Sequence, residues 1–409
     1  MRTPINKFNM LNKIYFKNYK RFRDEQVMEL RPVTVLVGRN SSGKSSVTKL
    51  LPLLANATKG IIKTPFLFEN EGMSVGNSFA DVGNNGSRLG LMFGVEYSNG
   101  CRIKAEMASD STGQKIQISN YEMDFLQNSF ILGINEERNG YNSNESANVS
   151  YDIASFSGLL NKELIKKADL ALREFSINVD YIGPFRCIPE RIVNSKGKIA
   201  DQSVGYDGMK AYQLLCQDSK LVEAVSKWYQ QSFDGCSLKV ELVIGLLGAY
   251  QLNLYKKDSD YPVNISDEGQ GMSQVLPIIT RANMQVKDSI VVMEQPELHL
   301  HPRAHASIAH ILAQSSKLRD NDGSLLNQHY LVETHSENIL LGLRDAVVDK
   351  DIDFGPDDVI LYFVQEREDG TSWLKPIYIT EKGELTYWPK GVFNESYELL
   401  RNLQIKANS

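Results

Sequence analysis

A glycine-rich segment at residues 38–46 carries the residue types that bind nucleotide phosphates. It fits the pattern G-x-x-x-x-G-K-[ST] at every fixed position. The glycines allow backbone N–H groups to approach phosphate oxygens closely, and Lys44 supplies an ammonium group for the β- and γ-phosphates. The Ser45 hydroxyl is the expected magnesium ligand. The predicted nucleotide site consists of Gly38, Arg39, Asn40, Ser41, Ser42, Gly43, Lys44, Ser45 and Ser46.

The flanking residues provide the elements that such a loop needs. Val33–Val37 is short, apolar and β-branched, which predicts a buried strand, and Lys44–Leu54 has the pattern of a helix. The start of that helix adds its positive end to the phosphate site. A chance glycine-rich turn is the alternative, and the strand, loop and helix in this order argue against it.

A second apolar strand is predicted at Ser289–Glu294, and it ends in acidic residues. A parallel strand delivers such a side chain to the C-terminal edge of its sheet, where ligands bind. We therefore expect Glu294 to be the second protein ligand of the magnesium ion.

The loop Ser266–Gln274 is polar, contains two glycines and precedes an apolar helical run. An ordinary surface turn is the alternative, but the position just before the acidic strand favours a functional loop. The loop resembles an ABC signature, which in that superfamily covers the γ-phosphate bound by the other protomer. The resemblance implies that Gly269 and Gly271 allow close approach and that Ser273 supplies the hydroxyl.

A third apolar strand, Tyr330–Glu333, leads into Thr334, His335 and Ser336. At this place His335 is expected to act as a switch residue that hydrogen-bonds the γ-phosphate or the attacking water. A histidine that caps the next helix is the alternative.

These segments together resemble the ABC-type ATPases that act on DNA or in its defence, namely RecF, the heads of structural-maintenance-of-chromosomes (SMC) proteins and overcoming-lysogenization-defect ATPases. Ile14–Phe22 is similar to the first strand of those heads, and Glu294–Pro302 to their E-x-P-E-x-H-L-H-P box. The resemblance implies ATP and Mg²⁺ as cofactors. It also implies a homodimer, or a higher assembly of dimers, that buries two ATP molecules.

Two further segments resemble one subgroup of these proteins. Tyr181–Arg186 is similar to a Y-h-G-P-h-R element, and Trp388–Glu395 to the W-P-x-G-F-F-D-E ending of prokaryotic AAA-type ATPases with a C-terminal domain of unknown function. Many of those occur in antiphage or mobile-element loci beside a nuclease gene. The resemblance therefore implies a separate effector nuclease as partner.

Gln295 departs from the usual pattern, in which a glutamate after the strand acid polarises the attacking water. An amide cannot accept a proton as a carboxylate does. Either Glu297 or His335 takes over this task, or hydrolysis is slow and the protein works as a switch. The candidate catalytic residues are Glu294, Gln295, Glu297 and His335.

Composition restricts the ligands and the location that the protein can have. The formal net charge of −5 over 409 residues argues against extensive wrapping by nucleic acid, although a local groove for DNA or RNA stays open. The basic clusters at residues 17–23 and 162–167 are candidates, with a solvated face as the alternative. The crowding of His299, His301 and His305 suggests zinc, but the box explains His299 and His301. The scattered cysteines and the lack of a long apolar segment predict a cytoplasmic protein without membrane contact.

The expected fold is α/β: an ABC-type P-loop ATPase head, with a mixed sheet flanked by helices, an inserted β-lobe and a helical lobe. No heptad pattern persists long enough for a long coiled coil. The expected units are residues 1–63 and 238–345 for the two parts of the head, 64–158 for the β-lobe, 159–237 for the helical lobe and 346–409 for a family-specific domain.

Three functions follow from this reading. The first is an ATP-dependent switch in antiphage defence or DNA metabolism that controls a separate effector nuclease. The second is the nucleotide-binding subunit of a membrane transporter, against which the box and the C-terminal element argue. The third is a scaffold that senses ATP and hydrolyses it slowly, which Gln295 favours.

Overall fold

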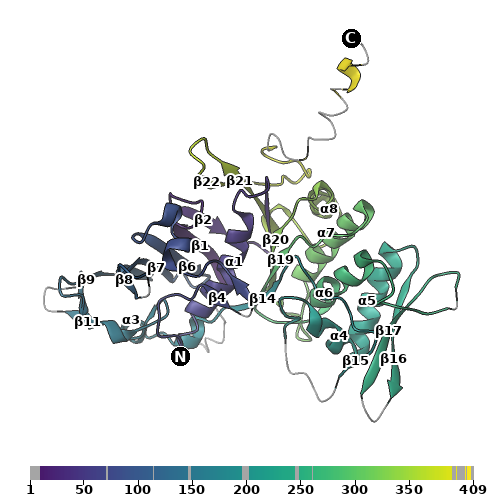
Figure 1. Ribbon diagram of the computed structural model, residues 1–409, viewed down its shortest axis with the longest axis horizontal. Helices are drawn as coiled ribbons and strands as arrows, with labels where there is room; N and C mark the ends of the chain where they lie inside the picture. The colour runs from purple at the N-terminus through teal and green to yellow at the C-terminus, as the bar shows by residue number, and fades with distance from the viewer. Residues whose placement is uncertain are drawn as a thin grey trace.

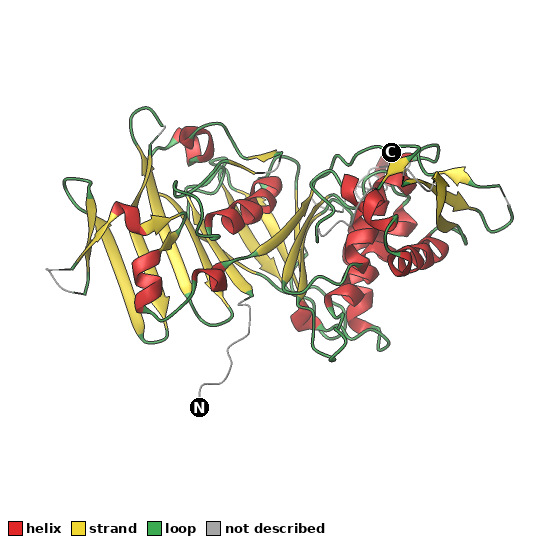
Figure 2. Cartoon of the chain, turned by 90° about the horizontal axis from the view of Figure 1, so that it is seen from below, coloured by secondary structure: helices red, strands yellow, loops and turns green. Residues whose placement is uncertain are grey.

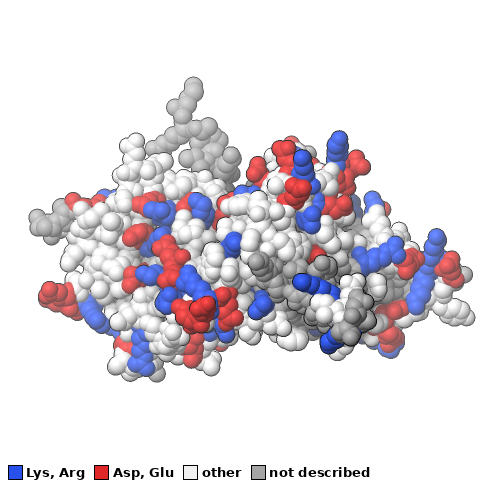
Figure 3. Space-filling model, turned by 90° about the horizontal axis from the view of Figure 1, so that it is seen from above, with Lys and Arg blue, Asp and Glu red and all other residues white. Residues whose placement is uncertain are grey.

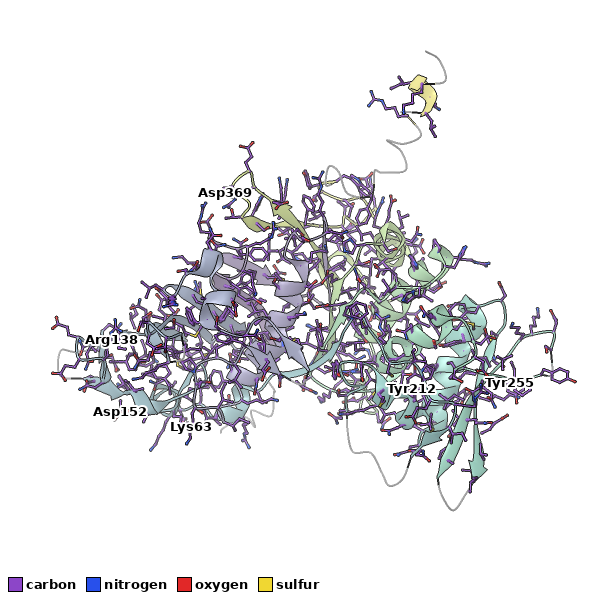
Figure 4. The ribbon with its side chains drawn as sticks, in the orientation of Figure 1. Lys63, Arg138, Asp152, Tyr212, Tyr255 and Asp369 are labelled. Carbon is purple, nitrogen blue, oxygen red and sulfur yellow. The ribbon has the colours of Figure 1, made fainter. Side chains whose placement is uncertain are left out.

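The computed structural model describes residues 10–70, 72–113, 115–145, 149–195, 202–244, 248–259, 261–388, 393, 401 and 403–406. A β-rich half and a helix-rich half lie on either side of a central sheet (Figure 1). Six labelled residues mark these regions in Figure 4: Lys63, Arg138 and Asp152 in the β-rich half, Tyr212 and Tyr255 in the helix-rich half, and Asp369 in the turn after β21.

A six-stranded sheet forms the centre of the molecule, in the order β14-β19-β20-β3-β21-β22. The first five strands are parallel, and β22 pairs with β21 in the antiparallel direction. Strands β3 and β19 are buried along their whole length, as expected for strands covered on both faces. The bounds are β14 Asn178–Ile182, β19 Ser289–Glu294, β20 Gln328–Glu333, β3 Val33–Gly38, β21 Val359–Glu366 and β22 Ser372–Ile377.

Successive side chains of this sheet enter two different hydrophobic cores, because strand side chains alternate between faces. Leu36 of β3 and Val292 of β19 pack in the core that contains helix α1 (Lys44–Ala57). Val35 and Val291 pack instead in the core of the helix-rich half. The sheet thus separates α1 from the other long helices.

The β-rich half is an antiparallel sheet in the order β11-β10-β9-β8-β7-β6-β1-β2, seen as the row of yellow strands in Figure 2. Its apolar face packs on α1, so α1 lies between the two large sheets. The bounds are β1 Leu11–Lys17, β2 Gln26–Glu29, β6 Leu91–Tyr97, β7 Arg102–Ser109, β8 Ile116–Phe125, β9 Asn128–Ile134, β10 Gly140–Ser143 and β11 Ser150–Asp152.

The helix-rich half packs on the other face of the central sheet and carries a small sheet of its own, β15-β17-β16, with β18 paired to β17. Its helices are α4 Met209–Leu215, α5 Ser219–Ser232, α6 Gln270–Asn283, α7 Pro302–Ser316 and α8 Glu337–Val348. Its strands are β15 Val193–Asn194, β16 Ser237–Ile244, β17 Ala249–Tyr255 and β18 Val263–Asn264.

Short elements connect these parts. They are β4 Glu69–Asn70, β5 Met73–Ser74, α2 Phe79–Val82, β12 Phe156–Ser157, β13 Leu160–Asn161 and α3 Lys162–Lys167, with 3₁₀ turns at Asn84–Gly86, Ile153–Ser155, Leu172–Phe175 and Pro356–Asp358. In the described part of the chain, no helix is long and apolar enough to cross a membrane.

The sheets run across the expected unit boundaries. Strands β1 and β2 belong to the same sheet as the expected β-lobe, and β21 and β22 complete the central sheet although they follow residue 346. Strand β14 also joins the central sheet. Residues 159–175 have a helical pattern and belong to the expected helical lobe, but they form only the short α3 and a 3₁₀ turn packed in the core of the β-rich half. The sequence pattern also predicts a short helix at 394–403, which lies almost wholly outside the described residues.

Candidate active site

The phosphate loop connects β3 to α1, and packing explains both of its fixed glycines. Gly38 and Gly43 have φ values of 155° and 108°. A Cβ on Gly38 would lie 2.9 Å from the carbonyl oxygen of Val364, and a Cβ on Gly43 would lie 3.1 Å from the Phe22 ring. The loop therefore fits its surroundings only without side chains at these two positions.

Lys44, the first residue of α1, is folded back onto its own loop. Its Nζ donates hydrogen bonds to the carbonyl oxygens of Gly38 at 3.1 Å and Arg39 at 2.8 Å. Burial lowers the pKa of its ammonium group, and the nearby Glu333 carboxylate opposes that shift. The loop thus holds a desolvated cation where the motif requires one.

Two carboxylates face the start of α1 from neighbouring strands. The Ser45 hydroxyl donates to Glu333 Oε1 at 3.0 Å, and the Thr48 hydroxyl donates to Glu294 Oε1 at 2.6 Å. Glu294 and Glu333 are register partners at the ends of β19 and β20. Sequence reasoning selected Glu294 and missed Glu333, although Glu333 also ends a buried apolar strand and the same rule could have identified it.

Both carboxyl groups have a raised pKa, mainly because they are buried. The pKa of Glu333 reaches about 7, since the nearby Glu294 charge adds to burial and outweighs the opposing effects of Ser45 and Lys44. Glu333 Oε2 is buried without a hydrogen-bond partner in the described structure. Hydroxyl and carboxylate oxygens suit a hard cation, so Ser45, Glu294 and Glu333 fit Mg²⁺.

A cavity of about 640 Å³ opens in front of Ser45 and Glu333, whereas Glu294 is not among its lining residues. One wall comes from the phosphate loop and the start of α1, and another from the ends of the central strands. A third wall comes from the β1–β2 turn and the segment around α2. The lining residues are Asn40, Ser41, Gly43, Lys44, Ser45 and Ser46, then Gln295, Glu333 and His335, and finally Lys20, Arg21, Ala80, Asp81, Gly83, Asn85 and Gly86.

Basic residues of the cluster at residues 17–23 therefore line the cavity or form contacts within the protein. Lys20 lines the cavity and donates to the Asp81 carbonyl oxygen at 2.7 Å. Arg21 also lines the cavity and pairs with Glu366, while Arg23 pairs with Asp369 at 3.0 Å. On the face seen in Figure 3, basic side chains are interspersed with acidic ones.

His335 and Glu297 are in contact but have different surroundings. His335 lines the cavity, and burial followed by the Lys44 charge lowers its pKa. Glu297 Oε1 accepts hydrogen bonds from the Thr334 hydroxyl and from the His335 backbone N–H, both at 2.8 Å. Glu297 is not among the residues that line the cavity. Its observed contacts hold the segment that carries His335.

The signature-like loop lies at the start of α6, and Gly269, Gly271 and Ser273 are not among the residues that line the cavity of the same chain. A Cβ on Gly271 would lie 2.5 Å from the His299 carbonyl oxygen, so this glycine packs against the box. The Ser273 hydroxyl donates to the Gln270 carbonyl oxygen at 3.3 Å. The phosphate loop and the signature are thus not brought together within one chain.

His301 and His305 make contacts within the protein. His301 caps α7 through a hydrogen bond from the Arg303 N–H, and His305 contacts the Ser336 hydroxyl at 2.7 Å and the Leu300 carbonyl oxygen at 3.2 Å. Among the described residues, no group of three or more His, Cys, Asp or Glu side chains is arranged to hold a metal ion.

The fold is a mixed α/β head with a phosphate loop between a buried parallel strand and a helix, and the described residues contain no long coiled coil. The chain belongs to the family described as "AAA domain, putative AbiEii toxin, Type IV TA system", whose model matches residues 33–341. Residues 355–403 match a second family, "Protein of unknown function (DUF3696)". These matches confirm the resemblance to AAA-type ATPases with a C-terminal domain of unknown function. No curated protein matches the chain in sequence.

Solved SMC heads are similar to this chain. The SMC head domain from Thermotoga maritima has 13% identity and a TM-score of 0.40, over 90% of this chain and 98% of that one. An SMC head bound to the C-terminal winged-helix domain of ScpA has 11% identity and a TM-score of 0.44, with the same coverage. A head with an extended coiled coil bound to ScpA, from Pyrococcus furiosus, has 10% identity and a TM-score of 0.43, over 97% of this chain and all of that one.

Proposed function

We propose that the chain binds ATP and Mg²⁺ in the cavity described above and works as a nucleotide-dependent switch. The observation that carries the proposal is the convergence of Lys44, Ser45, Glu333 and His335 on one cavity at the C-terminal edge of the parallel strands. This is where ligands bind in open α/β sheets. Membership of a family of ATPase domains supports the same function.

Each residue has a defined task in this proposal. Lys44 leaves the carbonyl oxygens of Gly38 and Arg39 and binds the β- and γ-phosphates, together with backbone N–H groups of residues 38–46. Ser45, Glu294 and Glu333 provide oxygen ligands for Mg²⁺, which neutralises charge on the transferred phosphoryl group. His335 donates a hydrogen bond to the γ-phosphate or to the attacking water.

Gln295 occupies the position usually held by the glutamate that activates water, so another group must replace it. Glu333 supports this task better than Glu297 does, because Glu333 lines the cavity and Glu297 does not. Glu297 instead supports the segment that carries His335. Hydrolysis is slow in this proposal, because the amide of Gln295 lies where a carboxylate is usual.

A second copy completes each site in our proposal. Gly269, Gly271 and Ser273 do not line their own chain's cavity, and Gly269 is exposed whereas the Ser273 side chain is buried. In the proposed dimer this segment covers the γ-phosphate bound by a partner copy. The result is a homodimer with two ATP molecules at its interface. It acts in the cytoplasm in antiphage defence or DNA metabolism and controls a separate effector nuclease, with DNA or RNA as a further ligand. The family's description as an AbiEii-type domain supports a defence role.

The second candidate is a scaffold that senses ATP with little hydrolysis, and Gln295 is the residue that favours it. Measurements of ATP turnover and of mass by light scattering, with and without ATP and Mg²⁺, distinguish the two. A switch turns over ATP slowly and dimerises with ATP, whereas a scaffold dimerises without turnover. Lys44→Ala and Ser273→Arg variants that bind ATP and assemble like the parent would overturn both.

A further inference from the structure

Arg186 lies in the loop after β14 and is buried, with 6% of its surface exposed. Its Nη2 donates hydrogen bonds to the carbonyl oxygens of Glu294 at 3.0 Å and Gln295 at 2.8 Å, and its Nη1 contacts the Gln274 carbonyl oxygen at 3.5 Å. Gln274 Nε2 returns hydrogen bonds to the carbonyl oxygens of Arg186 and Cys187 at 3.2 and 3.3 Å. One side chain therefore joins the end of β19 to the first turn of α6.

This guanidinium is costly to keep in the protein interior. Its hydrogen bonds go to carbonyl oxygens, and burial lowers its pKa to about 10 even though the Glu297 charge opposes the shift. Its Nε is buried without a partner in the described structure. Arg281, which is also buried among the described residues, instead pairs with Asp180 at 2.8 Å. A buried cation without such a pair destabilises the fold. Its presence therefore indicates that it serves another purpose.

The contact with Gln295 indicates that purpose. Gln295 has a left-handed backbone, with φ of 46°, which costs about 1 kcal/mol or more for a residue with a side chain. Three hydrogen bonds hold it: its N–H donates to the Glu333 carbonyl oxygen at 2.8 Å, and its own carbonyl oxygen accepts from Arg186 at 2.8 Å and from the Leu298 N–H at 3.1 Å. Gln295 lines the nucleotide cavity. Arg186 thus fixes a strained residue beside the site of ATP chemistry.

The contact with Gln274 connects the same guanidinium to the signature. Gln274 is the residue after Ser273, and the Ser273 carbonyl oxygen accepts a hydrogen bond from the Tyr212 hydroxyl at 3.1 Å. Because buried hydrogen-bond networks shift as units, a movement of Gln295 changes the constraint on the first turn of α6.

We propose that Arg186 is a positioning residue that couples the chain's own ATP cavity to its signature loop. ATP bound against Gln295 shifts the Arg186 contacts and sets the position of Gly269–Ser273, the segment offered to the second copy. The inference rests on the proposed ATP-dependent dimer. It adds a route by which each protomer reports its nucleotide state to the site of its partner.

Hydrogen exchange measured by mass spectrometry tests the coupling. The protein is diluted until light scattering gives the mass of one chain, so that partner contacts cannot protect the signature. In the parent, we expect ATP with Mg²⁺ to slow exchange in residues 38–50 and also to change exchange in residues 269–276. In the Arg186→Lys variant, the lysine ammonium group is a point donor that cannot bridge three carbonyl groups. We therefore expect this variant to show only the change of hydrogen exchange in residues 38–50.

Gln274→Leu interrupts the same bridge from the other side and is expected to give the same loss. Arg319→Lys, an exposed arginine after α7, is the matched control and should respond like the parent. Melting curves verify that each variant is folded. The inference is overturned if residues 38–50 respond in the parent while residues 269–276 do not, or if both bridge variants keep the second response. A parent that shows no response in residues 38–50 would overturn the proposed ATP site together with the inference.

Discussion

The Ser45 hydroxyl donates a hydrogen bond to Glu333 at 3.0 Å, which joins the phosphate loop to the strand that carries His335. Glu333 is also the register partner of Glu294 on the neighbouring strand. Two buried carboxylates therefore lie beside the first turn of α1, where the motif alone predicts one. This arrangement offers a replacement for the carboxylate that Gln295 lacks.

Replacing Glu333 with Gln is expected to reduce ATP turnover by about 100-fold or more, because the amide cannot accept a proton and binds Mg²⁺ weakly. Glu297→Gln is the matched comparison, since it changes a carboxylate outside the cavity lining. We expect a smaller loss of turnover there, through misplacement of His335. Steady-state phosphate release measures both variants, and a larger loss in Glu297→Gln would assign water activation to Glu297 instead.

Removing the Lys44 ammonium is expected to weaken ATP binding by about 10- to 100-fold, the value of a charge-assisted hydrogen bond. The fold should change little, because Lys44 contacts only carbonyl oxygens of its own loop among the described residues. Calorimetric titration of Lys44→Ala with ATP and Mg²⁺ measures the effect. Lys59→Ala, an exposed lysine just after α1, serves as the control and should bind like the parent.

The two signature glycines are expected to respond differently to alanine. A Cβ on Gly269 meets nothing within 4 Å, whereas one on Gly271 lies 2.5 Å from the His299 carbonyl oxygen. Gly271→Ala should therefore reduce the free energy of unfolding by about 1–3 kcal/mol, the usual cost of overpacking. Gly269→Ala should leave stability unchanged and weaken only ATP-dependent dimerisation. Chemical denaturation and light scattering separate the two effects, and equal stability losses would contradict the packing.

His329 on β20 is expected to make stability depend on pH. Burial lowers its pKa from 6.5 to about 4, so the unfolded chain binds the proton more readily. Stability is then complete above pH 6.5 and is lost as the pH falls toward 4. Between pH 7.5 and pH 5 the loss is about 2 kcal/mol. Urea unfolding at both pH values measures the free energy of unfolding, and in His329→Gln its loss between pH 7.5 and pH 5 should be smaller by that amount. A loss equal to that of the parent would refute the role of His329.

The phosphate loop and its flanking strand and helix were predictable, because the motif, the apolar run of β3 and the helical pattern of α1 are all local in sequence. The third apolar strand is predictable for the same reason, although the local pattern around it singles out His335 and not the acid Glu333 that ends it. The cavity wall formed by Lys20 and Asp81 could not be predicted, since it depends on contact between segments about 60 residues apart with no shared pattern.

Long-range strand pairing also explains why the boundaries of the structural units could not be predicted from the sequence. Strand β1 pairs with β6 in a register that joins Lys13 to Glu96, and β3 pairs with β21 in one that joins Val33 to Val359. Nothing in the local composition of these segments specifies a partner so distant along the chain. The stretch at residues 159–175 has helical spacing, but tertiary packing against the β-rich half leaves only short turns.

Helix α1 lies between the two large sheets, so the family-matched region cannot be separated from the rest of the chain without removing strands from both sheets. The family model begins at residue 33, yet the sheet that covers one side of α1 begins with β1 at Leu11 and continues to β11. A fragment cut at the family boundaries would lack β1 and β2 of that sheet, and β21 and β22 of the central sheet. Expression of the matched region alone should therefore yield an aggregating polypeptide, and the nucleotide site is best studied in the whole chain.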